Sequence, residues 1–355
     1  MADHPVLFLP GPTEVDDELR QIMAMPLVGH REPQFVAVVQ DVCRRLQQLY
    51  LTAGPAAFET CPATALMEAA IRNLVPRGGR SLHLVCGAFS ERWQKIAQLC
   101  GRDAEAMTVP AGHAHDPAAL QERLQKGPPV HAVAITHNET ATGVLEPLQA
   151  LAAVVRRHAP DALVLVDVVT SLGGAELRFA DWGLDFAFAG TQKCLALPPG
   201  LCTFAASERA LARAATIEER GFLLDLPRTL KETNEGVTLA TPCVPLVYAL
   251  ERQLVRVAAE GLPQRWARHL AMRDATLAWA QRSGMAPFVQ DPAARSPTVS
   301  CIEARGRDVD AMAKKALAAG FKIDKGYGNL KGVAFRIGHM GDHGLDRVHA
   351  LLAAI

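Results

Sequence analysis

Short apolar segments alternate with segments of helical periodicity along most of this chain, and this alternation limits the fold more than any other feature. A continuous apolar run such as ALVLVDVVT (162–170) predicts a strand that is buried on both faces. Leu148–His158 instead spaces its apolar residues as one face of a helix does. Buried strands joined by helices predict a parallel sheet covered on both sides. The predicted strands are Ser81–Gly87, His131–His137, Ala162–Thr170, Asp185–Ala189 and Cys202–Ala206.

The pattern changes near residue 245. Pro245–Glu260 predicts a long helix, and the following strands and helices are short and mixed. We expect strands at Thr298–Glu303 and Val333–Gly338, with helices at Val309–Ala319 and at the C-terminal end. The sequence therefore predicts an α/β fold, in which a large domain with a mostly parallel sheet is followed by a smaller α+β domain.

The overall composition argues against several classes of partner. Lys+Arg and Asp+Glu are balanced at 37 each with no long run of one sign, so neither a nucleic acid nor an anionic membrane is expected to bind. No apolar stretch approaches the roughly 20 residues that span a bilayer, and the first 20 residues lack a signal-peptide pattern. Eight cysteines occur singly, without a C-x-x-C pair, which favours a reducing, cytoplasmic location.

Two polar residues stand where chemistry is expected in such a sheet, at the carboxyl ends of strands. Asp167 lies near the end of the predicted strand Ala162–Thr170, and Lys193 is the one basic residue in DFAFAGTQKCLALPPGL (185–201). Taken alone, Asp167 could equally be a helix cap or the partner of a nearby base, and Lys193 could equally be a loop lysine whose amine reaches solvent. Together they match pyridoxal phosphate chemistry, because a desolvated lysine can form a Schiff base and a carboxylate keeps the pyridine nitrogen protonated.

Seven motifs occur in an order that resembles the class V aminotransferases, close to the alanine–glyoxylate and serine–pyruvate transaminases. They are LPGPTEV (9–15), GHREPQF (29–35), GAFSERW (87–93), THNETATGV (136–144), VDVVTSLGG (166–174), GTQKCLALPPGL (190–201) and FRIGHMG (335–341). The resemblance implies pyridoxal 5'-phosphate as cofactor and the aminotransferase fold. It also implies domain limits: an N-terminal segment (1–20) that lines the active site, a large cofactor-binding domain (21–245) and a small C-terminal domain (246–355).

The resemblance also assigns roles to single residues. Lys193 would form the Schiff base and move protons, and Asp167 would pair with the pyridine nitrogen. Arg336 would clamp the substrate's α-carboxylate with its planar fork, beside Gly11 of the N-terminal motif. The remaining cofactor contacts would be Phe89 on the ring face, the Thr140 hydroxyl, Gln192 beside the lysine, and Thr238 and Thr241, which would reach the cofactor phosphate of a partner subunit in a homodimer with shared active sites.

The phosphate loop departs from the family pattern. The family has a small loop that contains glycine, whereas this chain has Cys61-Pro62-Ala63-Thr64. A helix N-terminus binds phosphate through backbone N–H groups, and proline has none. Proline is well tolerated at the first helical position, and we consider the case in which Pro62 occupies it. The N–H groups of Ala63 and Thr64 and the Thr64 hydroxyl would then bind the phosphate, with one donor fewer than usual.

Other motifs favour no competing chemistry. The histidines of GHAHD (112–116) and HMGDHG (339–344) match no zinc spacing, so we expect solvated or capping residues and no metal site. No G-x-G-x-x-G follows the first strand, which argues against a nicotinamide enzyme. Cysteine desulfurases share the fold but need an exposed cysteine, whereas Cys301 lies in a predicted strand.

We therefore predict a pyridoxal-phosphate aminotransferase. It would move an amino group from a small L-amino acid, alanine or serine, to a small 2-oxo acid, glyoxylate or pyruvate. No second arginine for a side-chain carboxylate is evident, which favours neutral donors. A phosphonate transaminase or a lyase on the same scaffold, and a non-catalytic descendant, remain as alternatives.

Overall fold

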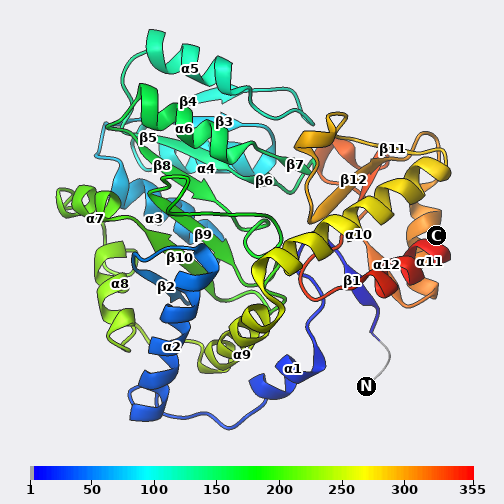
Figure 1. Ribbon diagram of the computed structural model, residues 1–355, viewed down its shortest axis with the longest axis horizontal. Coiled ribbons are helices and arrows are strands. Elements are labelled where there is room, and N and C mark those ends of the chain that lie inside the picture. Colours follow the sequence, from blue (N-terminus) through cyan, green and yellow to red (C-terminus); the bar gives the residue numbers. More distant parts are fainter. Residues whose placement is uncertain (1–3) are drawn as a thin grey trace.

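The computed structural model describes residues 4–355 and is built around a seven-stranded sheet (Figure 1). The strand order is β2-β10-β9-β8-β5-β3-β4. Neighbouring strands from β9 to β4 are parallel, and β10 is antiparallel to both of its neighbours, which confirms the predicted mostly parallel sheet. The strands are β2 (Ala56–Glu59), β3 (Arg80–Val85), β4 (Asp103–Thr108), β5 (Ala132–Thr136), β8 (Leu163–Asp167), β9 (Phe186–Gly190) and β10 (Cys202–Ala206).

Helices cover both faces of this sheet because alternate strand residues point to opposite sides. In β8, Val164 and Val166 belong to one apolar cluster, and Leu163 and Leu165 belong to another. Each fully buried side chain of this size stabilises the fold by about 1.5–3 kcal/mol. The first cluster includes residues of α2, α5, α6 and α9, and the second includes residues of α3, α4, α7 and α8. The helices around the sheet are α1 (Asp17–Met23), α2 (Pro33–Tyr50), α3 (Ala63–Leu74), α4 (Ala88–Leu99), α5 (Pro117–Lys126), α6 (Leu148–His158), α7 (Glu208–Ala215), α8 (Leu226–Asn234) and α9 (Val244–Glu260).

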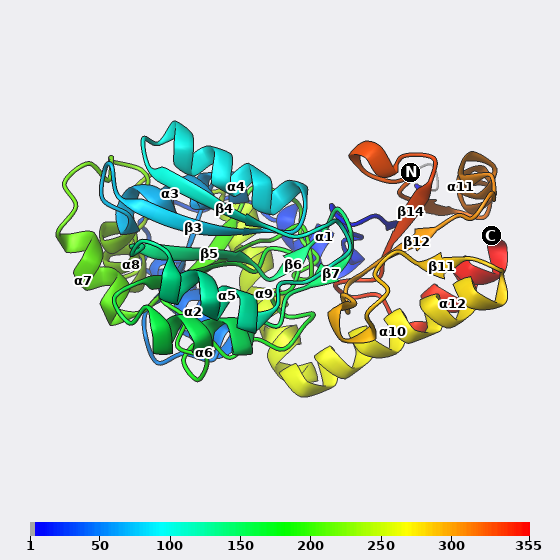
Figure 2. The same cartoon turned by 90° about the horizontal axis from the view of Figure 1, so that it is seen from above.

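A smaller lobe lies beside this large lobe, and α10 runs along it from the end of α9 (Figure 2). Its antiparallel sheet has the order β11-β12-β14 and a core of its own. The N-terminal strand β1 (Val6–Phe8) pairs in parallel with β13 (Phe321–Ile323), so the start of the chain packs in the small lobe. Its other elements are α10 (Leu262–Arg282), β11 (Ala286–Pro287), η1 (Pro292–Ala294), β12 (Val299–Glu303), α11 (Val309–Ala318), η2 (Gly328–Leu330), β14 (Ala334–Gly338) and α12 (Leu345–Ala354).

The predicted elements differ from the observed ones mainly at their ends, but two strands of the large sheet, β2 and β4, were not predicted. The strand predicted to reach Thr170 ends at Asp167, because the Val169 N–H donates to Asp167 Oδ1 at 2.8 Å and turns the chain away from the sheet. A short hairpin of β6 (Asn138–Glu139) and β7 (Val144–Leu145) projects from the end of β5. Across residues 4–355, no helix has both the length and the hydropathy to span a membrane.

Candidate active site

Lys193 is a buried amine beyond the C-terminal end of β9. Its side chain leaves the chain three residues after Gly190, and the residue is 9% exposed. The Nζ donates a hydrogen bond to the Pro10 carbonyl, and within residues 4–355 no carboxylate lies at ion-pair distance from it. Burial lowers the pKa of Lys193 to about 8, and the nearby charge of Arg336 acts in the same direction. The amine is therefore closer to its neutral, reactive form at physiological pH than an exposed lysine is.

Asp167 is the last residue of the neighbouring strand β8, so both predicted catalytic groups lie at the same edge of the sheet. The carboxylate is buried, and Val169 is its hydrogen-bond donor in the described part of the chain. Burial raises the pKa of Asp167 to about 7, and the charge of Glu139 adds to this effect. Because one hydrogen bond offsets little of the cost of burying this negative charge, a cationic partner would stabilise the carboxylate.

The N-terminal segment closes one side of Lys193. Gly11 has a φ of +122°, and a Cβ there would lie 2.6 Å from the lysine Cδ. The following turn is fixed by Thr13, whose N–H donates to the Gln192 carbonyl at 3.3 Å and whose hydroxyl donates to the Met340 carbonyl at 3.3 Å. The predicted residues Gly11 and Gln192 therefore adjoin the lysine, and Thr13 is a connection that the sequence did not reveal.

Replacing Gly11 by alanine is expected to destabilise the protein by about 1–3 kcal/mol, the usual cost of a residue forced into a backbone region reserved for glycine. The new methyl group would also displace the Lys193 side chain. Urea denaturation of G11A measures the effect. Gly344→Ala is the matched control, because Gly344 has a φ of −114° and open space around its Cα. Equal stability of the two variants would contradict the prediction.

The helix expected to hold a phosphate begins at Ala63. Pro62 is the N-cap of α3, one residue before the helical position that was considered for it. Its φ of −73° would suit a helix, but its ψ of 150° is extended, so the helix begins after it. The consequence for donors is unchanged: the N–H groups of Ala63 and Thr64 have no acceptor in the part of the chain that is described.

Thr238 and Thr241 lie in the segment between α8 and α9. The Thr238 hydroxyl donates to the Ala240 carbonyl at 2.8 Å, and Thr241 is exposed. The N–H of Cys243 donates to the Thr60 hydroxyl at 3.1 Å, so this segment adjoins the phosphate loop of its own chain.

Phe89 is in the first turn of α4 with its ring half-buried. The Arg92 guanidinium lies 5.0 Å from the ring centroid, and the Tyr327 ring lies 5.8 Å away. The buried Glu139 holds this helix end, because its Oε2 accepts the N–H groups of Phe89 at 3.0 Å and Ser90 at 3.1 Å. A buried acid at a helix N-terminus satisfies free donors and complements the helix dipole. The sequence signal for it was an acid in the otherwise uncharged stretch ITHNETATGV (135–144).

Arg336 extends from β14 and connects the small lobe to the hairpin after β5. It is 5% exposed, its Nε donates to Asp324 Oδ1 at 2.8 Å, and its Nη1 donates to the Thr140 carbonyl at 2.8 Å. The Thr140 hydroxyl is hydrogen-bonded to that of Thr170 at 2.6 Å. In the described chain Nη2 has no acceptor, and the Tyr327 ring lies 5.3 Å from the guanidinium. One edge of the fork is thus available to a carboxylate.

The expectation of solvated or capping histidines was wrong for His115, His339 and His343, all of which are buried. His115 donates from Nδ1 to Glu146 Oε1 at 2.7 Å and from Nε2 to the Met107 carbonyl at 2.9 Å. Burial opposes its charge, but the contact with Glu146 raises the pKa of His115 above its ordinary value. Its partner lies 31 residues away in the sequence, so the motif alone could not reveal the pair.

The large sheet has β10 as its single reversed strand, and Lys193 follows β9. These two features place the chain in the aminotransferase class of α/β folds. The solved structure of alanine–glyoxylate aminotransferase from Nostoc sp. matches it with a TM-score of 0.93 at 30% identity, covering 100% of this chain and 95% of that one. The chain belongs to the class V aminotransferases, since the family model Aminotransferase class-V matches residues 60–328. An aminotransferase of Methanocaldococcus jannaschii described as uncharacterised is 35% identical and covers 99% of this chain and 91% of that protein. L-aspartate–glyoxylate aminotransferase of Paracoccus denitrificans is 31% identical and covers 96% and 87%.

Proposed function

We propose that this protein is a pyridoxal 5'-phosphate-dependent transaminase that moves the amino group of L-alanine or L-serine to glyoxylate or pyruvate. The observation that carries the proposal is the buried amine of Lys193, which has no acidic partner within residues 4–355, at the same sheet edge as the buried carboxylate of Asp167. Membership of the class V aminotransferases supports the reaction type. The Nostoc relative is named for alanine and glyoxylate, which supports the choice of substrates.

The residues present fit this cofactor in their chemistry. The N–H groups at the start of α3 would bind its phosphate, with the Thr64 hydroxyl beside them. The carboxylate of Asp167 would face the ring nitrogen, and Phe89 would cover one face of the ring. Gln192 and the Thr140 hydroxyl would line the site near Lys193. When bound, the cofactor supplies an electron sink that weakens the bonds to the donor's α-carbon.

The chain's own groups then perform the remaining work. Arg336 binds the carboxylate common to amino and 2-oxo acids, and so fixes the orientation of the reacting carbon. The Nζ of Lys193 accepts the proton from the α-carbon and later returns one, which a pKa near 8 permits because both protonation states are accessible. Asp167 holds the opposite charge needed at the ring nitrogen.

An absorbance spectrum of the purified protein, supplied with pyridoxal phosphate, tests this proposal. Adding L-alanine or L-serine should shift the visible band and release the matching 2-oxo acid. A shift with L-aspartate alone would move the donor class to acidic amino acids. A band that shifts with an aminophosphonate but with no 2-aminocarboxylate would indicate a phosphonate transaminase. Release of ammonia without an acceptor would indicate a lyase. Absence of any band would contradict the cofactor assignment.

Arg336→Lys is expected to raise the KM for donor and acceptor alike by about 10- to 100-fold, because a hydrogen bond to a charged group contributes about 1.5–3 kcal/mol. Both substrates carry the carboxylate that the fork would bind. Steady-state kinetics with each substrate in turn measure the change. Arg305→Lys is the control, since Arg305 is 56% exposed in a turn of the same lobe. A change in KM for only one substrate would contradict a shared clamp.

The homodimer and the cytoplasmic location are also part of the proposal. Large apolar side chains are exposed at Leu27, Phe222 and Val237, which supports burial against a second copy. Thr238 and Thr241 would then reach the partner's site. All eight cysteines are free thiols, as a reducing compartment requires. Analytical ultracentrifugation tests the dimer.

A further inference from the structure

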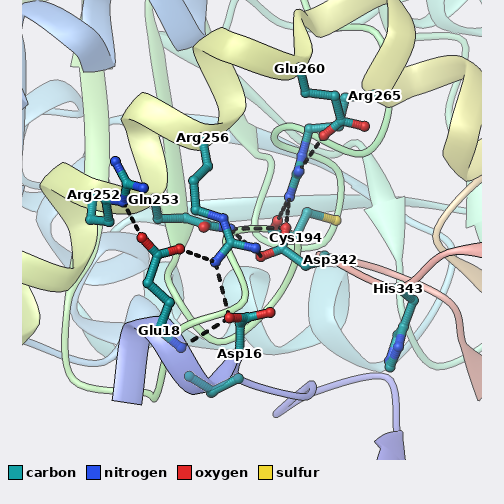
Figure 3. Close-up of polar contacts among 12 residues, drawn as sticks. Asp16, Glu18, Cys194, Arg252, Gln253, Arg256, Glu260, Arg265, Asp342 and His343 are labelled. Carbon is teal, nitrogen blue, oxygen red and sulfur yellow. Dashed lines mark hydrogen bonds and ion pairs between the residues drawn. The ribbon is translucent and has the colours of Figure 1, made fainter. Parts of the chain in front are cut away.

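Arg265 is a buried cation that joins three separated segments (Figure 3). It lies in the first turn of α10, and its side chain is 2% exposed. Its Nη1 donates to Glu260 Oε2 at 2.7 Å, and its Nη2 donates to Asp342 Oδ1 at 3.0 Å and to the Cys194 carbonyl at 2.7 Å. These acceptors belong to the end of α9, the segment after β14 and the loop that carries Lys193.

The charges around Arg265 form a neutral network, which is what allows a guanidinium to be buried there. Asp342 also accepts from Gln253, at 3.0 and 3.1 Å, and lies 3.3 Å from Arg256. Figure 3 shows how this network continues to α1 through Asp16 and Glu18. Its four cations are Arg252, Arg256, Arg265 and Arg268, and its four acids are Asp16, Glu18, Glu260 and Asp342.

The bond to Cys194 fixes the lysine loop from outside. Cys194 follows Lys193 directly, so its carbonyl sets the orientation of the backbone from which the amine extends. Within the loop, the Ala196 N–H donates to the Lys193 carbonyl at 2.9 Å, and the Cys194 thiol donates to the Thr170 carbonyl at 3.3 Å. The contact with Thr170 holds the loop to the segment after β8 in the large lobe, whereas Arg265 holds it to the helix that leads into the small lobe.

The hydrogen bond to Asp342 fixes the segment that follows β14, the strand that carries Arg336. Asp342 lies six residues after Arg336, on the segment that follows β14. The preceding residue, Gly341, has a φ of +80°, and a Cβ there would lie 3.0 Å from the Ala196 Cβ and 3.4 Å from the Lys193 carbonyl. This segment therefore rests directly on the lysine loop, and one nitrogen of Arg265 bonds to both.

We propose that Arg265 is a positioning residue that sets the spacing between the Lys193 amine and the Arg336 guanidinium across the two lobes. The proposal rests on the proposed function, in which these two groups act on the same substrate. A lysine at this position would retain the charge but not the planar fork that reaches both Nη2 acceptors and Glu260. The distance between the Lys193 amine and the Arg336 guanidinium would then change, while the network would remain neutral.

Arg265→Lys and Arg265→Met test this role, with Arg252→Lys as the matched control. Arg252 belongs to the same network but is 43% exposed and does not contact the lysine loop. We expect kcat to fall by about 10- to 100-fold in R265K, because an ångström-scale misplacement of catalytic groups has effects of this size. The KM of the carboxylate substrates should change less than kcat, and the melting temperature of R265K should stay near that of the wild type. A folded R265K with unchanged kcat would overturn the proposal.

Hydrogen exchange of peptides from residues 191–202 gives a second readout that does not depend on turnover. The loop amides should exchange faster in R265K than in R252K or the wild type, in the cofactor-free protein. Exchange identical in all three would overturn the positioning role even if R265M failed to fold. A wild type that exchanges as expected but transaminates nothing would instead contradict the proposed function alone.

Discussion

Lys193→Ala is expected to lose transamination by at least about 10⁴-fold, the upper range for removal of a positioned general acid–base group. The variant lacks the buried amine that would join the cofactor and move the substrate proton. Within residues 4–355, no other lysine is buried, so nothing nearby can take its place. Steady-state rates with L-alanine and glyoxylate measure the loss.

Lys322→Ala is the control for this variant, because Lys322 is an exposed lysine on β13. It should transaminate at the wild-type rate. Retention of more than about 1% of the wild-type rate by K193A would contradict the role of the amine, since even modest general acid–base catalysis contributes about 10²-fold.

Asp167→Asn is expected to lower kcat by about 10²- to 10³-fold, as removal of a preorganised electrostatic group does in other enzymes. The asparagine can still accept the Val169 N–H, so the turn after β8 should survive. What it removes is the negative charge that would stabilise a protonated ring nitrogen. The wild-type kcat in a correctly folded D167N would exclude that role.

The same substitution should stabilise the cofactor-free protein at alkaline pH. The pKa of Asp167 is about 7 in the folded state and about 3.9 in an unfolded chain, so the folded protein binds more protons between these values. This group therefore reduces stability as the pH rises from about 4 to 7, and a cost of about 4 kcal/mol is fully present above pH 7. Asparagine does not ionise and avoids this cost.

Thermal melts of cofactor-free D167N and wild type at pH 5 and pH 8 measure the effect. D167N should melt at the higher temperature at pH 8, and the gap should narrow at pH 5. A gap of equal size at both pH values would mean that the carboxylate does not titrate in this range.

The sequence predicted the parts of the fold that depend on local pattern. The apolar runs of β8 and β9 are long enough to predict buried strands, and the helix Leu148–His158 was predicted with its exact limits. The predicted catalytic residues Asp167 and Lys193 could be found from the sequence for the same reason, since both interrupt apolar segments near the end of a strand. The family resemblance added residues such as Arg336, and their roles remain predictions.

The parts that could not be predicted depend on partners far away in the sequence. Glu139 was not assigned because the helix end that it caps begins 50 residues earlier. His115 was expected to be solvated because its motif resembles a loop, and only the fold brings Glu146 against it. Arg265 lies in a helix with several arginines, and only its burial against Cys194 separates it from the others.

The pairing of β1 with β13 has a consequence for biosynthesis. Val6–Phe8 are translated long before their partner strand, Phe321–Ile323. Until β13 has been made, the peptide that carries Pro10 has no strand to hold it against Lys193. Contacts between residues so distant in sequence form late, because loop closure must come first. The large sheet can therefore form early in the nascent chain, whereas the N-terminal side of the Lys193 site closes only after β13 has been translated.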